Sequence, residues 1–354
     1  MVAATLGWDI GGAHLKAVLV DVHGKVQWAK QLYCPLWRGL HELEHALDEV
    51  MAECDVAQHV VTMTGELTDI FINRREGVLQ ISQCLNNRLF GKINFYAGRS
   101  GIVSLNAVED KVMDIASMNW LASVQFIAKN VPNALFVDIG STTTDIAKIQ
   151  HGQVYVQGFD DATRMQSNEL IYTGVVRTPL MALAQRIQFQ DMTSNVAAEY
   201  FATTADIYTL IDALSLNDNI AESADGEGKK KWDCARRIAR MVGQDVEVFS
   251  MDVWHKLAYA FKYEQSQLIR TGMQTHLAQL NSSNVNFSKA ISNQTTFIVG
   301  CGVGSFLARE IATELGYLYR SVEEFIYAEN EATKRVASVC FPAYAVAMLG
   351  LMSC

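Results

Sequence analysis

The sequence predicts an α/β protein with two related lobes, and an internal repeat is the main reason. Asp9-Ile10-Gly11 near the start recurs as Asp138-Ile139-Gly140, and a His-Gly pair follows each copy. The chain has 354 residues, which is more than a single hydrophobic core usually serves. We therefore expect an N-terminal lobe over 1–132 and a C-terminal lobe over 133–354, the second with a helical insertion at about 186–290.

Each copy of the repeat is typical of three strands joined by glycine turns. Apolar, β-branched runs punctuated by glycine are typical of such strands. The first copy places them at 6–10, 15–20 and 26–33, and the second at 134–139, 145–150 and 154–159. Two matching three-strand units indicate two related lobes.

Helix-like segments separate and follow the two copies. Apolar residues at helical spacing predict helices over 40–54, within 104–129, over 200–214 and over 251–277. Residues 297–316 are typical of a strand, a glycine turn and a helix. The closing run 343–352 is apolar and rich in small residues, which predicts a buried helix.

Composition narrows the class of protein and its partners. Half of the residues are hydrophobic, 19% are charged, and the net charge of −9 argues against nucleic-acid binding. We find no signal peptide and no apolar run long enough to span a bilayer, so we expect no membrane partner. Seven scattered cysteines without a CxxC pair indicate reduced thiols in the cytoplasm. A homo-oligomer is compatible with the sequence, which leaves the oligomeric state open.

The first glycine turn could hold an anion. Its glycines permit positive φ and close approach of a ligand, and successive N–H groups in such a turn form an anion-binding concavity. Asp9 could hold Mg²⁺ and Lys16 could reach a phosphate. The alternative is a plain hairpin with a solvated lysine. The binding residues of this turn would be Gly11, Gly12, Ala13 and His14.

The second glycine turn carries a run of hydroxyl residues. Their hydroxyl and amide groups could donate to phosphate oxygens, and Asp138 and Asp145 are available for a metal ion or an attacking group. A Ser/Thr-rich β-turn is the alternative. The binding residues here would be Gly140, Ser141, Thr142 and Thr143.

A third glycine turn, with Gly300, Gly302 and Gly304, lies between a predicted strand and a predicted helix. Such a turn suits an anion or nucleotide at the helix N-terminus. Its spacing differs from the GxGxxG dinucleotide pattern, so by itself it indicates little.

Together, the three turns resemble the actin-like ATPase superfamily, which includes sugar kinases, Hsp70 and the hydantoinase/oxoprolinase group. Its signatures are a DxGGxxxK loop, a DxGxTTxD loop and a late glycine turn, and all three occur here in that order. The resemblance covers essentially the whole chain. It implies two ribonuclease-H-like lobes around a central cleft, with Mg²⁺ held by Asp9 and Asp138.

Further segments resemble narrower groups. Residues 64–69 and 74–78 are similar to the hydantoinase-like branch, and 172–180 and 199–206 to a methanofuran-biosynthesis family linked to tetrahydromethanopterin-dependent one-carbon metabolism. That resemblance implies a transferase of alkyl or aryl groups other than methyl. It would condense an aminomethylfuran-methyl diphosphate with the phenol oxygen of γ-glutamyltyramine, or of a tyrosine-derived analogue, and release pyrophosphate.

One departure bears on the choice of substrate. Kinases of the superfamily carry Thr or Ser after the glycine pair of the first loop, whereas this chain has Ala13 and then His14. The missing hydroxyl favours a substrate diphosphate over ATP. An ATP-dependent small-molecule kinase or hydantoinase/oxoprolinase-type ATPase remains an alternative, as does a nucleotide-sensing actin-like protein without turnover.

Several other residues have two interpretations. Glu66 and Asp69 either begin a helix or line the cleft, and Arg177 could pair with a substrate carboxylate or phosphate. Asp206 interrupts an apolar helix and needs a partner, either within the protein or on the substrate. Asp9, Asp138 or Asp145 could assist deprotonation of the phenol, and the sequence does not select one.

Overall fold

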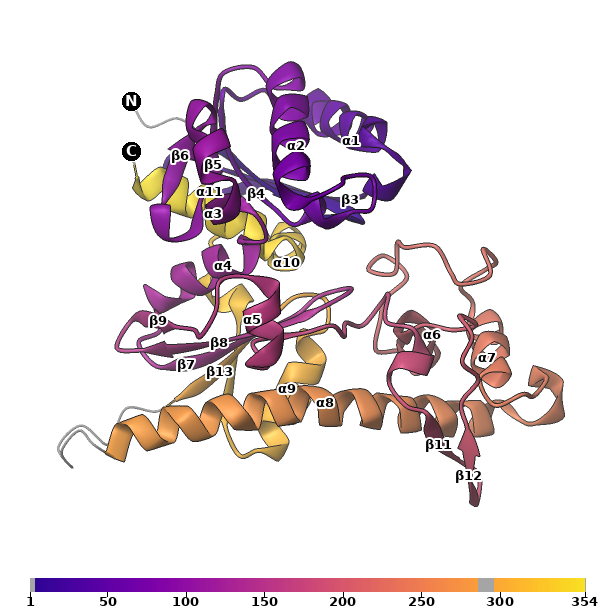
Figure 1. The fold of residues 1–354 in the computed structure, drawn as a ribbon. Helices are drawn as coiled ribbons and strands as arrows, with labels where there is room; N and C mark the ends of the chain where they lie inside the picture. Colours follow the sequence, from indigo (N-terminus) through magenta and orange to yellow (C-terminus); the bar gives the residue numbers. More distant parts are fainter. Residues whose placement is uncertain (1–3, 286–295, 354) are drawn as a thin grey trace. The chain divides into compact units, whose positions relative to one another are not determined.

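The computed structural model describes residues 4–285 and 296–353, with the backbone alone for 281–285. Its contacts divide the chain into two units (Figure 1). Unit 1 contains the chain up to Asn133, then Ile149–Asp161 and the C-terminal segment from Ser321. Unit 2 contains Ala134–Lys148 and Ala162–Arg320. The predicted division assigned everything after 132 to the second lobe, whereas the contacts group 149–161 and the C-terminal segment with unit 1.

Unit 1 is built on a six-stranded mixed sheet with the strand order β3-β2-β1-β4-β5-β6. The strands β1 to β3 are antiparallel, β4 and β5 run parallel to β1, and β6 is antiparallel to β5. The first three strands lie where the first copy of the repeat predicted them. The strands are β1 Thr5–Ile10, β2 His14–Val20, β3 Val26–Tyr33, β4 Gln58–Met63, β5 Lys92–Tyr96 and β6 Ile102–Ser104.

Helices cover both faces of this sheet. Leu6, Trp8 and Ile10 of β1 join the core formed with α1 (Leu40–Glu53) and α2 (Arg74–Arg88). The next side-chain position, Gly7, faces the other way, and a Cβ atom there would overlap the backbone of Ala343 in α11. Alternation along the strand thus explains why the apolar C-terminal helix returns to the first sheet. The remaining elements of unit 1 are α3 Val112–Ile115, α4 Asn119–Ala128, β9 Gln153–Tyr155, α10 Glu331–Val339 and α11 Phe341–Met352.

Unit 2 contains a second sheet with the order β10-β8-β7-β13-β14. Its strands β7 and β13 are parallel, whereas β10 is antiparallel to β8. The second copy of the repeat is less complete than predicted, because β9 ends at Tyr155 instead of continuing to 159. The strands are β7 Ala134–Ile139, β8 Thr144–Gln150, β10 Leu170–Ile171, β13 Phe297–Cys301 and β14 Leu318–Ser321.

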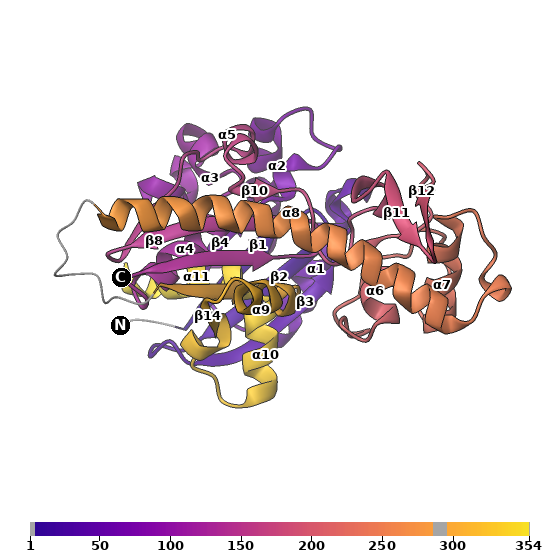
Figure 2. The same ribbon diagram turned by 90° about the horizontal axis from the view of Figure 1, so that it is seen from below.

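A long helix, α8 (Met251–Val285), organises the rest of unit 2 (Figure 2). It extends beyond the predicted end at 277. Gly272 in its second half lies against Ile146 of β8 and Ile171 of β10. The predicted insertion at 186–290 contains a β-hairpin as well as helices. The other elements are β11 Arg186–Phe189, β12 Met192–Asn195, α5 Asp161–Gln166, α6 Thr204–Leu210, α7 Lys231–Arg240 and α9 Ser305–Glu314.

Two observations bear on the expectations from composition. None of the described helices is by itself long and apolar enough to cross a membrane, and only the bent pair α10 and α11 together meets the length and composition criteria. The six cysteines within the described residues are all buried free thiols, whereas Cys354 lies outside them.

Candidate active site

The first glycine turn connects β1 to β2 and directs its carbonyl groups into the protein. The carbonyls of Gly12 and Ala13 accept hydrogen bonds from the amides of Leu36 (3.0 Å) and Cys34 (2.9 Å). Among the residues that the structure describes, no acceptor binds the N–H groups of Gly12 and Ala13. Two adjacent amides are therefore available for an anion.

The two glycines of this turn serve for space and not for an unusual backbone conformation. Neither Gly11 nor Gly12 has a positive φ, which differs from the expectation above. A Cβ atom at Gly12 would lie 2.9 Å from Cγ2 of Thr68, and one at Gly11 would lie 2.9 Å from the carbonyl oxygen of His14. Side chains are thus excluded because neighbouring atoms approach closely.

Asp9 and Lys16 face each other across the β1–β2 pair, where they are register partners. Nζ of Lys16 lies 3.7 Å from Oδ2 of Asp9, which is 3% exposed. Asn119 at the start of α4 donates from Nδ2 to Oδ1 of Asp9 (3.3 Å). Burial raises the pKa of Asp9, and Lys16 and Asn119 oppose that rise. The proposed metal ligand and the proposed phosphate-binding lysine therefore lie together in unit 1.

A second buried acid, Glu66, lies on the turn after β4. Of the two acids weighed in this segment, Glu66 is 1% exposed whereas Asp69 is exposed. Its Oε1 accepts a hydrogen bond from Oγ of Ser117 (2.8 Å), while Oε2 has no partner among the described residues. Burial is the main cause that raises the pKa of Glu66 to about 7.

The second glycine turn, residues 140–143, is held by the chain segment 173–178, which we call the clamp. The amide of Val175 donates to the carbonyl of Gly140 (3.0 Å), and the amide of Arg177 to that of Ser141 (2.8 Å). A Cβ atom at Gly174 would lie 2.5 Å from the amide nitrogen of Thr142, so the two backbones touch. This contact explains why a glycine occupies position 174.

The clamp leaves the donors of the second turn available. The carbonyls of Gly140, Ser141 and Thr143 accept hydrogen bonds, whereas the N–H groups of residues 141–143 have no acceptor in the described part of the chain. The hydroxyl groups of Ser141 and Thr142 contact each other at 3.4 Å. Such a set of donors suits a multiply charged anion.

Buried hydrogen bonds from α8 and α6 fix the position of the clamp. Gln265 of α8 donates from Nε2 to Oγ1 of Thr173 and to the carbonyl of Gly174, both at 2.8 Å. Its Oε1 accepts from the hydroxyl of Tyr208 (2.6 Å). Fully paired buried networks of this kind fix a single local geometry.

The third glycine turn packs directly against the second. The amide of Gly304 donates to the carbonyl of Ile139 (2.8 Å). Gly302 has φ +79°, and a Cβ atom there would overlap Oδ1 of Asp138. Gly300 faces the ring of Tyr319. The structure therefore brings the second and third turns together at the ends of β7 and β13 in unit 2.

The remaining predicted site residues of unit 2 have different surroundings. Asp145 pairs with Arg164, whose Nη2 lies 2.9 Å from Oδ1 of Asp145 and whose side chain is 1% exposed. This buried ion pair gives Asp145 a structural role besides any role in chemistry. The side chain of Arg177 is half-buried, and its charge acts on the phenol of Tyr200.

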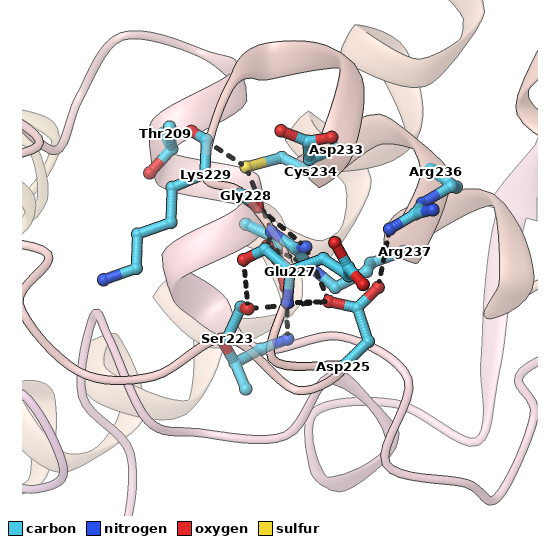
Figure 3. Close-up of polar contacts among 12 residues, drawn as sticks. Thr209, Ser223, Asp225, Glu227, Gly228, Lys229, Asp233, Cys234, Arg236 and Arg237 are labelled. Carbon is cyan, nitrogen blue, oxygen red and sulfur yellow. Dashed lines mark hydrogen bonds and ion pairs between the residues drawn. The ribbon is translucent and has the colours of Figure 1, made fainter.

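Arginines of α7 form an ion-pair cluster around the buried pair of Arg237 and Asp206 (Figure 3). Nε of Arg237, whose side chain is 1% exposed, donates to Oδ1 of Asp206 (2.8 Å), and its Nη1 donates to Oδ1 of Asp225 (2.9 Å). Asp225 also accepts from Arg236 (2.9 Å). Asp206 forms a capping box with Thr203 at the start of α6. The partner that Asp206 required is thus within the protein.

The described residues contain no group of three or more His, Cys, Asp or Glu side chains that could enclose a metal ion. Mg²⁺ is commonly held by one or two carboxylates together with water and substrate phosphates. Asp9, a buried carboxylate beside a turn with available amides, fits that mode of binding. Asp138, a partly buried residue beside the second and third turns, offers a second carboxylate.

The chain has the fold of the actin-like ATPases. A nucleotide-free structure of acetone carboxylase superimposes on it with a TM-score of 0.53 and 11% sequence identity, over 98% of this chain and 70% of the other. The hydantoinase/oxoprolinase family matches residues 58–339. This chain therefore belongs to the hydantoinase/oxoprolinase family, as the segments 64–69 and 74–78 predicted.

Two curated relatives share one name, (4-{4-[2-(gamma-L-glutamylamino)ethyl]phenoxymethyl}furan-2-yl)methanamine synthase. The protein from Methanocaldococcus jannaschii is 30% identical over 281 residues, which are 79% of this chain and 84% of the relative. The protein from Methanococcus vannielii is 30% identical over 226 residues, which are 64% of this chain and 94% of the relative. The predicted similarity to the methanofuran-biosynthesis family is thus confirmed.

Proposed function

We propose that this enzyme joins an aminomethylfuran-methyl diphosphate to the phenol oxygen of γ-glutamyltyramine, or of a tyrosine-derived analogue, in methanofuran biosynthesis. The observation that carries the proposal is the 30% identity to the Methanocaldococcus jannaschii synthase over most of both chains. The name of that synthase describes a phenoxymethyl ether that bears an aminomethylfuran and a γ-glutamylamino group, which is the product of the proposed reaction. The six buried free thiols support a location in the reducing cytoplasm.

The proposed reaction is a substitution at the methylene carbon of the furan. A lone pair of the phenol oxygen forms the new C–O bond, and the bond to the diphosphate oxygen breaks with its electron pair leaving on pyrophosphate. The phenol proton passes to a base or to water. The furan ring can delocalise positive charge at the methylene carbon, so negative charge gathers on the diphosphate as the bond breaks.

The first and second turns and the residues beside them would stabilise this leaving group. We assign a role in binding phosphate oxygens to each turn by itself, through the available amides of Gly12 and Ala13 in unit 1 and of Ser141 to Thr143 in unit 2. Asp9 in unit 1 and Asp138 in unit 2 would each offer a carboxylate to Mg²⁺, which neutralises developing charge on a phosphate oxygen. Lys16 contributes a positive charge beside Asp9. We assign to Arg177 an ion pair with the substrate carboxylate or with a phosphate oxygen.

The decisive experiment supplies two sets of substrates. Purified protein with Mg²⁺ is incubated with the furan diphosphate and γ-glutamyltyramine, and separately with ATP. Equal amounts of ether and pyrophosphate support the proposal, whereas ADP release without ether would favour the kinase or ATPase alternative. Binding of ATP without turnover of either set would favour a nucleotide sensor.

A pair of variants ties the activity to the second turn. Asp138→Ala should abolish ether formation with the fold intact, because it removes a partly exposed carboxylate that we assign to Mg²⁺. Asp191→Ala, at the exposed turn of the β11–β12 hairpin in the same unit, should keep full activity. Near-normal activity of Asp138→Ala would contradict the assignment.

A further inference from the structure

Asp9 and Glu66 both bind the short segment Ser117–Asn119, which joins α3 to α4. Asp9 lies near the end of β1 and Glu66 follows the end of β4. Because these two strands are parallel neighbours, both acids lie at the carboxyl ends of the strands. Glu66 accepts from the hydroxyl of Ser117 (2.8 Å), and Asp9 accepts from the side-chain amide of Asn119 (3.3 Å). One segment thus connects an acid of the proposed site to an acid outside it.

The connection from Glu66 through the segment Ser117–Asn119 to Asp9 includes two energetically unfavourable features. Ser117 has φ +57°, in the left-handed region that residues other than glycine, Asn and Asp rarely adopt. Oε2 of Glu66 is buried without a hydrogen-bond partner among the described residues, which also costs free energy. Strained backbone and unsatisfied polar groups that persist together commonly mark a functional site.

The orientation of Asn119 is fixed by the same segment. Its Oδ1 accepts the backbone amide of Trp120 (2.7 Å), so Nδ2 is the group that points to Asp9. Ala116 forms an isolated parallel bridge with Met63, the last residue of β4. This segment is therefore held at two points, by the bridge to Met63 and by the hydrogen bond from Ser117 to Glu66.

We propose that Glu66 is a positioning residue, which holds Asn119 against Asp9 through its hydrogen bond with Ser117. The proposal rests on the proposed function, in which Asp9 binds the metal–diphosphate group. Glu66 itself is buried and need not touch substrate. The charged groups that act on it are Asp161 and Arg74 of α2, which pair with each other at 2.9 Å.

A positioning role for Glu66 predicts different effects for two substitutions of this residue. Glu66→Gln keeps an oxygen that accepts from Ser117, so kcat for ether formation should stay within about threefold of wild type. Glu66→Leu removes the acceptor, so kcat should fall at least about tenfold while KM changes less than about twofold. Ser117→Gly, which tolerates the positive φ but lacks the hydroxyl, should reproduce the loss and serves if Glu66→Leu does not fold.

A control addresses lost stability as the cause. His59→Leu removes two hydrogen bonds of a buried side chain of β4, from Trp8 (3.3 Å) and to the carbonyl of Phe90 (3.0 Å). It should destabilise the protein and leave kcat within about twofold. Equal loss of kcat in His59→Leu and Glu66→Leu would overturn the positioning role, and so would a Glu66→Gln variant as inactive as Glu66→Leu.

Hydrogen exchange gives a readout that does not depend on the reaction. Backbone amides of 116–120 should exchange at least about tenfold faster in Glu66→Leu and Ser117→Gly than in wild type, and at the wild-type rate in Glu66→Gln. Unchanged exchange in Glu66→Leu would overturn the inference. If wild-type protein makes no ether while the exchange pattern appears, the proposed function fails and the link between Glu66 and this segment stands.

Discussion

Gly302 lies so close to Asp138 that a Cβ atom at position 302 would overlap Oδ1 of the aspartate. The contact joins the late glycine turn to the end of β7, and the positive φ of Gly302 shapes the turn around it. It shows why two glycine motifs distant in the sequence form one structure in unit 2.

We expect Gly302→Ala to abolish binding of Mg²⁺–pyrophosphate and to lower the free energy of unfolding by more than about 2 kcal/mol. Both the left-handed backbone and the clash with Asp138 and Ile139 contribute. Gly316→Ala is a matched control, since Gly316 has φ +75° and a Cβ atom there would meet no other atom within 4 Å. It should cost about 1 kcal/mol and leave binding unchanged. Calorimetry and urea unfolding measure the two effects, and equal losses in both variants would contradict the importance of the contact.

Gly174→Ala should weaken pyrophosphate binding at least about tenfold. Its Cβ atom would press on the backbone of Ser141 and Thr142, which cannot yield without moving the second turn. Gly272→Ala provides a comparison, because its Cβ atom meets only the side-chain ends of Ile171 and Ile146 at its closest contacts. Its pyrophosphate affinity, measured by titration calorimetry, should stay within about twofold of wild type. Unchanged affinity in Gly174→Ala would show that the clamp does not shape the anion site.

Asp145→Asn should destabilise the protein by about 3 kcal/mol, because the guanidinium of Arg164 is 1% exposed and would lose its charged partner. Asp212→Asn removes the exposed ion pair with Lys231 and should change the free energy of unfolding by less than about 0.5 kcal/mol. Urea unfolding measures both. A stable but inactive Asp145→Asn variant would instead assign Asp145 to the chemistry.

The stability of the protein should fall as pH rises through the range set by Glu66. Its pKa is about 7 in the folded protein against an ordinary value of 4.5, because burial disfavours the carboxylate. The folded state then binds a proton more tightly than the unfolded state between these values, so deprotonation costs up to about 3 kcal/mol by pH 8.

Glu66→Gln should remove this dependence. The free energy of unfolding of wild type minus that of the variant should decrease from about pH 4.5 to about pH 7 and level off above. A difference that does not change with pH, measured by urea unfolding between about pH 4 and pH 8, would show that Glu66 titrates normally.

Much of the site was predictable, because its motifs are local. The turns after Asp9 and Asp138, and the strands beside them, follow from short-range hydrophobic patterns and glycine punctuation. Glu66 could be weighed only as a helix start or a cleft residue, since its partner Ser117 is distant in the sequence. The central cleft and the catalytic roles of Asp9, Lys16, Asp138 and Asp145 stay predictions.

The sequence by itself determined the repeat, the three glycine turns and the family, because each depends on residue types at fixed local spacing. Only the tertiary structure decided that the C-terminal helix α11 packs against the first sheet, that Gly174 contacts the second turn, and that Asp145 pairs with Arg164. Those outcomes depend on which faces remain uncovered and which backbones can touch after the chain has folded. Such long-range packing leaves no periodic signal along the sequence.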